Sequence, residues 1–234
     1  MTTADPNHLI ETVEGLFLPE LRPEKVAPVS FDLVSELGAP EPINRAYVGL
    51  ARAINTVLES DYDAHVRDFD ERRDRLLDWR EHLTAHPIPD PEVSAAAIGR
   101  GEMTTSVALF GTDRWEGMYD DLSAMLLWAA QRSQETSRKF TVVVSVEKRA
   151  IDYVTRSSAQ VQQLVKSATR KMNRLPDDAT ERRQQITAAA EDNIAAVNAV
   201  VLRRVRALIR EVLDLDEGTA AIPTDEWLRR HGLD

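Results

Sequence analysis

The spacing of apolar residues along the chain predicts long helices. From Ile186 to Leu215 an apolar or Ala residue recurs every three or four positions, which is the ~3.6-residue period of an α-helix. The same rhythm runs from Tyr47 to Leu83. Proline and glycine are absent over most of these stretches, and a helix interior excludes the first and disfavours the second. We therefore expect long helices near 43–86, 118–174 and 178–215.

The middle stretch admits two interpretations. Residues 139–146 (KFTVVVSV) are rich in β-branched side chains, which suit a strand, and residues 104–110 (TTSVALF) could form a second strand. On a helical wheel, however, Phe140 and the valines of this segment share a broad face with Ala150 and Val154. Two lone strands would also make a poor sheet. We expect a helix at 139–146 and leave a strand open at 104–110.

Short helices are expected on both sides of the long ones. Each begins at a residue typical of a helix start and ends near a glycine. Asp178 and Thr224 are the expected N-caps of the last long helix and of the last short one. The short helices are predicted at 5–15, 30–37, 90–99 and 224–232.

The predicted fold is all-α, an elongated bundle of three or more long amphipathic helices with short flanking helices. The distribution of proline and glycine divides the chain into three parts. These are an N-terminal Pro-rich segment with short helices (1–42), the long-helix bundle (43–215), and a C-terminal linker with a short helix (216–234).

Composition places the chain among ordinary globular proteins and removes several kinds of site. The 234 residues are 43% hydrophobic and 29% charged, which is typical of soluble domains. The absence of cysteine excludes disulfides and thiolate metal sites. The N-terminal twenty residues contain no Lys or Arg, and the longest run without charged or strongly polar residues in the helical middle, 124–130, is far shorter than the roughly 20 residues of a membrane span. We expect a cytoplasmic protein without a membrane span.

Charge is distributed unevenly along the chain. The formal net charge is −10, yet residues 138–174 hold nine basic and two acidic side chains, a net of +7. On a helix, seven of these bases lie opposite Ala150, Val161 and Met172, which makes an amphipathic helix with a cationic face. We take this basic face as the candidate binding site for a partner or a phosphate. It consists of Lys148, Arg149, Arg156, Lys166, Arg170, Lys171 and Arg174.

Three interpretations of the basic face compete. It could lie near the acidic helix around 61–81, where surface ion pairs contribute little each, and charged faces are usually of this solvated kind. It could bind nucleic acid, although the chain as a whole is acidic and no aromatic residues interleave with the bases. It could instead bind an acidic protein partner. A membrane surface suits it less, because its apolar side is mostly Ala and Val.

Candidate chemistry is sparse. His82 and His86 have the spacing of metal ligands on one helix face, with Asp78 one turn earlier. Pro87 ends the helix there, and the glutamate of an HExxH site is missing. No phosphate-binding glycine loop and no serine nucleophile motif occurs. We therefore assign no catalytic residue and predict neither a metal nor a cofactor.

Two short patterns resemble known families. The pairs Arg75/His82 and Arg80/His86 resemble the Arg–His spacing of the all-α ribonucleases of the HEPN class. That resemblance implies an Arg that binds phosphate and a His that acts as acid or base. Trp115-Glu116-Gly117 resembles the Trp-x-Gly turn of the helical-hairpin substrates of type VII secretion. Their tail of Tyr followed four residues later by an acid is missing here, since Ser123 follows Tyr119.

The sequence therefore predicts a non-enzymatic helical interaction, assembly or adaptor protein that binds a protein partner or itself. The long amphipathic helices and the basic face between acidic ends are the reasons. The alternative is a protein that acts on nucleic acid. It would bind through the basic helix 148–174 or cleave RNA as a HEPN-like ribonuclease through His82 or His86.

Overall fold

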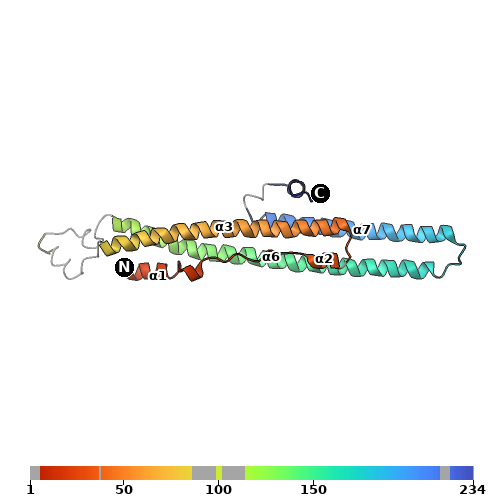
Figure 1. The fold of residues 1–234 in the computed structure, drawn as a ribbon, viewed down its shortest axis with the longest axis horizontal. Coiled ribbons are helices and arrows are strands. Elements are labelled where there is room, and N and C mark those ends of the chain that lie inside the picture. The colour runs from red at the N-terminus through yellow and green to blue at the C-terminus, as the bar shows by residue number, and fades with distance from the viewer. Residues whose placement is uncertain (1–5, 37, 86–98, 102–113, 217–221, 234) are drawn as a thin grey trace. The chain divides into compact units, whose positions relative to one another are not determined.

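The computed structural model describes residues 6–36, 38–85, 99–101, 114–216 and 222–233. Every regular element in these ranges is helical and none is a strand, so the all-α prediction is confirmed (Figure 1). In chain order the elements are α1 (Pro6–Glu14), the short 3-10 helix η1 (Pro19–Leu21), α2 (Asp32–Glu36), α3 (Glu41–Ala85), α6 (Arg114–Met172), α7 (Thr180–Leu213) and α9 (Thr224–Arg230).

The three long helices match the apolar periodicity. α3 has 45 residues, α6 has 59 and α7 has 34. α6 is unbroken, so residues 139–146 are helical and do not form a strand. Val143, Val146, Ala150 and Val154 recur at three- and four-residue steps and are all buried, which explains why a β-branched run stays in a helix. The possible strand at 104–110 and nearly all of the predicted helix at 90–99 lie outside the described residues.

Two helix starts differ from the prediction. α7 has Ala179 at its N-cap in place of Asp178, and α9 has Pro223 there in place of Thr224, which is the first helical residue. Neither cap makes a side-chain hydrogen bond. The first backbone donors of these helices therefore lack the expected side-chain acceptor.

The chain forms two compact units. Unit 1 comprises Met1–Lys25 and Tyr62–Ser137, and unit 2 comprises Val26–Asp61 and Arg138–Asp234. α3 and α6 each contribute one part to either unit. The three-part division at 42/43 and 215/216 follows the ends of helices, which proline and glycine mark, and it stays a prediction.

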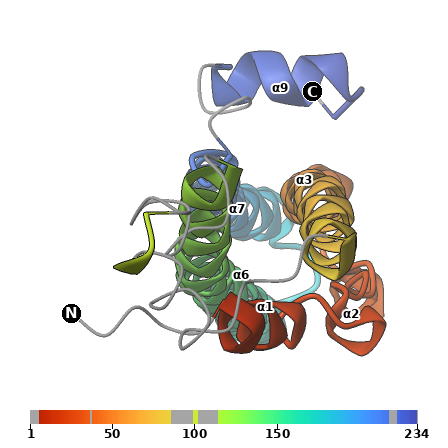
Figure 2. The same ribbon diagram turned by 90° about the vertical axis from the view of Figure 1, so that its left-hand side faces the viewer.

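Unit 1 is built from α1 and parts of α3 and α6, which lie side by side in Figure 2. Its core includes Phe17, whose ring lies 5.2 Å from that of Phe69 and 5.7 Å from that of Trp128. Trp79 Nε1 donates a hydrogen bond to Asp121 at 3.0 Å. These contacts join α3, α6 and the segment that follows α1, which are distant in sequence, so the unit has a packed core of its own.

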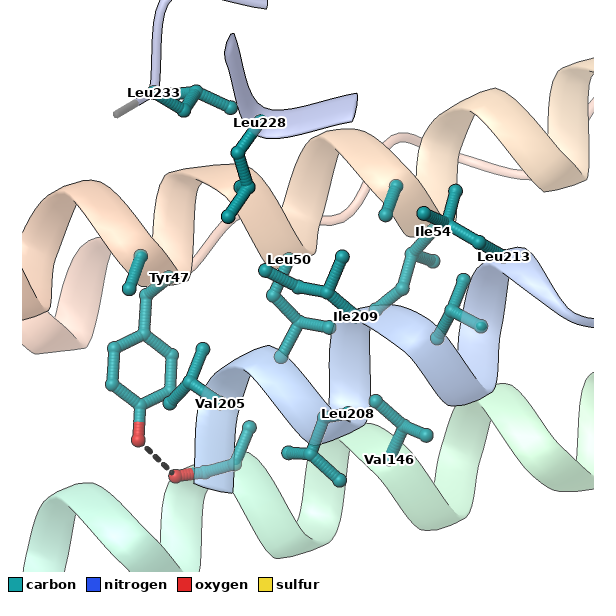
Figure 3. Close-up of a cluster of buried hydrophobic side chains, with 14 of the residues drawn as sticks. Tyr47, Leu50, Ile54, Val146, Val205, Leu208, Ile209, Leu213, Leu228 and Leu233 are labelled. Carbon is teal, nitrogen blue, oxygen red and sulfur yellow. Dashed lines mark hydrogen bonds between the residues drawn. The ribbon is translucent and has the colours of Figure 1, made fainter. Parts of the chain in front are cut away.

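Unit 2 packs α3, α6 and α7 around a larger core (Figure 3). Tyr47, Leu50 and Ile54 of α3 are fully buried among valines of α6 and α7. The hydroxyl of Tyr47 donates a hydrogen bond to the carbonyl oxygen of Ala150 at 3.0 Å. Burial raises the pKa of this phenol well above its usual value, and the nearby Tyr153 adds to the shift.

α9 covers one side of the unit 2 core. Trp227 is 1% exposed and stacks on His231, with ring centroids 4.0 Å apart. Leu228 and Leu233 point toward α3 (Figure 3). A Cβ on Gly49 would lie 3.1 Å from Leu228 Cδ2, so any other residue at this position would require the Leu228 side chain to shift.

Candidate functional site

The candidate site is the far part of the α6–α7 pair, which we call the distal hairpin. It comprises residues 155–200, with a turn at 173–179 that joins the two helices (Figure 1). α3 begins at Glu41, and its Ile43 lines a small cavity with Val154 and Val161. The three-helix core therefore ends near this level, and the two remaining helices continue beyond it as a pair.

The distal hairpin buries little of its apolar surface. Among residues 155–200, all of which the structure describes, only Ala168 is as little as 9% exposed. Val165 is 48% exposed and Val200 is 40% exposed. Alanines are frequent in this part of α7, and they let two helices approach closely but remove little area from water.

A groove runs along one face of this pair, and we call it the hairpin groove. It consists of two adjoining cavities of about 400 Å³ and 240 Å³, which share Leu164 and Asn193. Leu164 lies in its middle, together with small and branched apolar side chains of α7. These are Ile186, Ala189, Ala190, Ala196, Val197, Val200 and Val201.

The charged residues that line the hairpin groove are all basic. Arg156 and Arg204 line the cavity nearer the core, and Lys171 and Arg182 line the cavity nearer the turn. No Asp or Glu is among the lining residues of either cavity. The Arg204 guanidinium lies 5.1 Å from the centre of the Tyr153 ring, a cation–π arrangement that fixes its direction.

The structure divides the predicted basic face into three groups. Arg149 pairs with Glu211 at 2.6 Å, and this hydrogen bond raises the pKa of its guanidinium. Arg156 and Lys171 line the hairpin groove. The remaining four bases are exposed and do not line the groove. They are Lys148, Lys166, Arg170 and Arg174.

One base of the 138–174 block contacts the acidic stretch 61–81, and this base, Lys139, lies outside the predicted basic face. Lys139 lies 2.6 Å from Asp61, and the two side chains are 24% and 12% exposed. Arg156 pairs within α6 with Asp152 at 3.4 Å, and both remain largely exposed. Among the described residues, no carboxylate lies within ion-pair distance of the later bases of this block, which are Lys166, Arg170, Lys171 and Arg174, whereas Arg183 of α7 pairs with Asp177 of the turn at 3.4 Å.

Two of the four bases that line the hairpin groove are not part of the predicted basic face. Arg182 and Arg204 belong to α7, which lies in the segment 175–234, where eight basic and 12 acidic side chains give a net charge of −4. The two residues are 22 positions apart, close to six turns at ~3.6 residues per turn, so a helical wheel places them on one face. That signal was present, but the net charge of the segment concealed it.

The other sequence candidates lie in unit 1. The His82 ring packs edge-on against Trp79 at 6.1 Å, and His86 lies outside the described residues. Arg75 lies 3.4 Å from Asp121 and Arg80 pairs with Glu14, so carboxylates already engage both arginines of the ribonuclease-like pairs. Trp115 and Gly117 lie in the first turn of α6 and not in a turn between helices, which removes the resemblance to the Trp-x-Gly turn.

Metal sites and membrane-spanning helices are two further features for which the described residues provide evidence. Within the described ranges, no group of three or more His, Asp or Glu residues is placed to hold a metal ion. None of the described helices combines the length and the apolar character that crossing a membrane requires. No family model, no curated protein and no solved structure matches this chain.

Proposed function

We propose that this chain is a non-enzymatic helical interaction protein that binds a protein partner or itself through the distal hairpin. The hairpin groove is the observation that carries the proposal. Two antiparallel helices that continue beyond their third partner leave apolar side chains half-exposed, and in helical bundles a further helix covers such positions. Helix-in-groove recognition uses this type of surface.

The size of the face suits a modest interface. From Arg156 to Lys171 the face is about 22 Å long at ~1.5 Å per residue, and two helices side by side are about 20 Å wide. The resulting area of roughly 450 Å² lies below the ~800 Å² that each partner buries in a standard stable complex. A single docked helix that also contacts the groove edges would therefore bind reversibly.

A second candidate is binding of nucleic acid, as the sequence also allowed. α6 has no acidic residue after Asp152, and it carries four exposed bases beyond that point, with Arg174 following in the turn. Clustered bases of this kind release counterions from a phosphate backbone, so such binding would fall steeply with salt.

Site-specific crosslinking in living cells tests the proposal. A photo-reactive amino acid replaces Ala196, which lines the hairpin groove, and in a matched variant it replaces the neighbouring exposed Ala195, which does not. We expect Ala196 to crosslink to a protein, either a partner or a second copy, and Ala195 to do so much less. Equal yields at both positions, or adducts that nuclease treatment removes, would overturn the proposal.

A further inference from the structure

We propose that the occupant of the hairpin groove is an acidic amphipathic helix whose carboxylates lie near its two ends. This inference rests on the proposed function and names the chemistry of the partner. It follows from the placement of charge around an apolar centre in the groove.

The four bases stand at the two ends of the groove. Arg156 and Lys171 on α6 are 15 positions apart, about 22 Å at ~1.5 Å per residue. Arg182 and Arg204 on α7 are 22 positions apart, about 33 Å on the same scale. A helix along the groove would meet both ends if its acidic residues were separated by roughly four to six turns.

The middle of the groove favours a protein helix over nucleic acid. Leu164, Val197 and Val200 would be desolvated by an apolar helix face, and the alanines nearby allow close approach of its backbone. Single-stranded nucleic acid would instead require exposed aromatic rings for stacking. Tyr153 is the one aromatic residue in the lining of these two cavities, and Arg204 already lies over its ring.

A second copy docked through the same groove is disfavoured by charge. Each copy would bring its four bases to the shared face, and the groove lining offers no carboxylate to compensate them. Like charges opposed across an interface cost binding free energy and slow association. An acidic helix would instead strengthen binding and speed association, so the charges of the groove favour it as the occupant.

Two labelled peptides and the full-length protein provide the test. Both peptides are 22-residue helices with Leu and Ala at helical spacing along one face. One carries Glu residues at both ends and the other carries Lys residues at the same positions. We expect fluorescence anisotropy to show at least tenfold tighter binding of the Glu-ended peptide, with the difference shrinking as salt is added.

Charge-reversal variants make the test specific to the groove. Lys171→Glu combined with Arg182→Glu should weaken the Glu-ended peptide at least tenfold and strengthen the Lys-ended one. Lys166→Glu is the matched control, because it changes the same residue type in the same helix at an exposed position outside the groove lining. Circular dichroism establishes that all variants keep their helix content. A structural role for these residues would not reverse the preference between the peptides.

Several results would overturn the inference. These are equal binding of the two peptides, equal losses in the groove and control variants, displacement of the Glu-ended peptide by equimolar polyuridylate, and a dimer by light scattering that Ala196→Glu dissociates. If Ala196 crosslinks to a protein while peptide charge is irrelevant, the inference fails and the proposed function stands. If crosslinking and peptide binding both fail, neither stands.

Discussion

Two regions of unit 2 use the same helices with different results. In the first, which we call the three-helix core, α3 packs on α6 at residues 143–154 and on α7 at residues 201–213. Tyr47, Leu50 and Ile54 are fully buried there. The second is the distal hairpin, in which α6 and α7 continue with the same apolar rhythm but without α3. Leu164 and Val197 occupy equivalent inward positions there and stay partly exposed.

The comparison shows what an apolar stripe does and does not specify. Periodicity specifies that a helix has an apolar side, but it does not specify how many neighbours cover that side. The same pattern is a core where a third helix covers it and an open groove where none does. Residue size differs accordingly, since the core uses Leu, Ile and Tyr and the hairpin part of α7 uses mainly Ala.

The largest expected effect separates the two regions by stability. Ile54→Ala removes a fully buried side chain and should lower the free energy of unfolding by about 2–5 kcal/mol. Leu164→Ala removes a side chain that is only partly buried, so the loss should stay below about 1.5 kcal/mol. Urea titrations followed by circular dichroism measure both. Equal losses would show that the distal hairpin is as well packed as the core.

A smaller effect is expected where α9 joins the three-helix core. A Cβ on Gly49 would lie 3.1 Å from Leu228 and 3.4 Å from Leu233, so Gly49→Leu should push α9 away at a cost of about 1–3 kcal/mol. Trp227, now 1% exposed, reports the change if the other tryptophans are replaced by Phe. We expect its fluorescence to shift to the red and its quenching by acrylamide to rise. A fluorescence spectrum like that of the parent would mean that the leucines of α9 re-pack around the new side chain.

The hydrogen bond inside the core predicts a pH-dependent effect of about 1 kcal/mol. Tyr47→Phe removes the bond to Ala150 and should cost about 0.5–1.5 kcal/mol at neutral pH. Burial raises the pKa of Tyr47, so the folded state holds the neutral phenol. A raised pKa gives stability that is complete below the ordinary value of ~10 and is lost as the pH climbs toward the folded value. The advantage of the parent over Tyr47→Phe should therefore shrink above about pH 10, as urea titrations at several pH values would show. A constant difference would mean that Tyr47 ionises as freely in the folded protein as in the unfolded chain.

The long helices were predictable because the information for them is local. Proline, glycine and apolar spacing determine where α3, α6 and α7 run, and the same wheel argument placed residues 139–146 in a helix. The caps were less predictable, since Asp178 and Thr224 are good N-cap residues that the structure places one position away from the cap. A shift of one residue costs little when helix packing supplies most of the stability.

The candidate site was only half predictable for a different reason. Arg156 and Lys171 follow from the charge pattern of α6, but Arg182 and Arg204 join them through the pairing of two helices. The pairing of α6 and α7 also neutralises a base of the predicted face, because Glu211 of α7 forms an ion pair with Arg149. Which neighbour a surface residue meets depends on tertiary contacts that a single helical wheel does not contain.

The smallest expected effect concerns the ion pair between Arg149 and Glu211, which lies at the border between the two regions. Arg149 and Glu211 are 37% and 43% exposed, so a double-mutant cycle with Arg149→Gln and Glu211→Gln should give a coupling of about 0.2–1 kcal/mol that falls with salt. Arg149 lies outside the hairpin groove, and its charge is already compensated. Arg149→Gln should therefore leave the affinity for the Glu-ended peptide within twofold of the parent. A tenfold loss of that affinity would extend the docking surface back onto the three-helix core and end the distinction between the two regions.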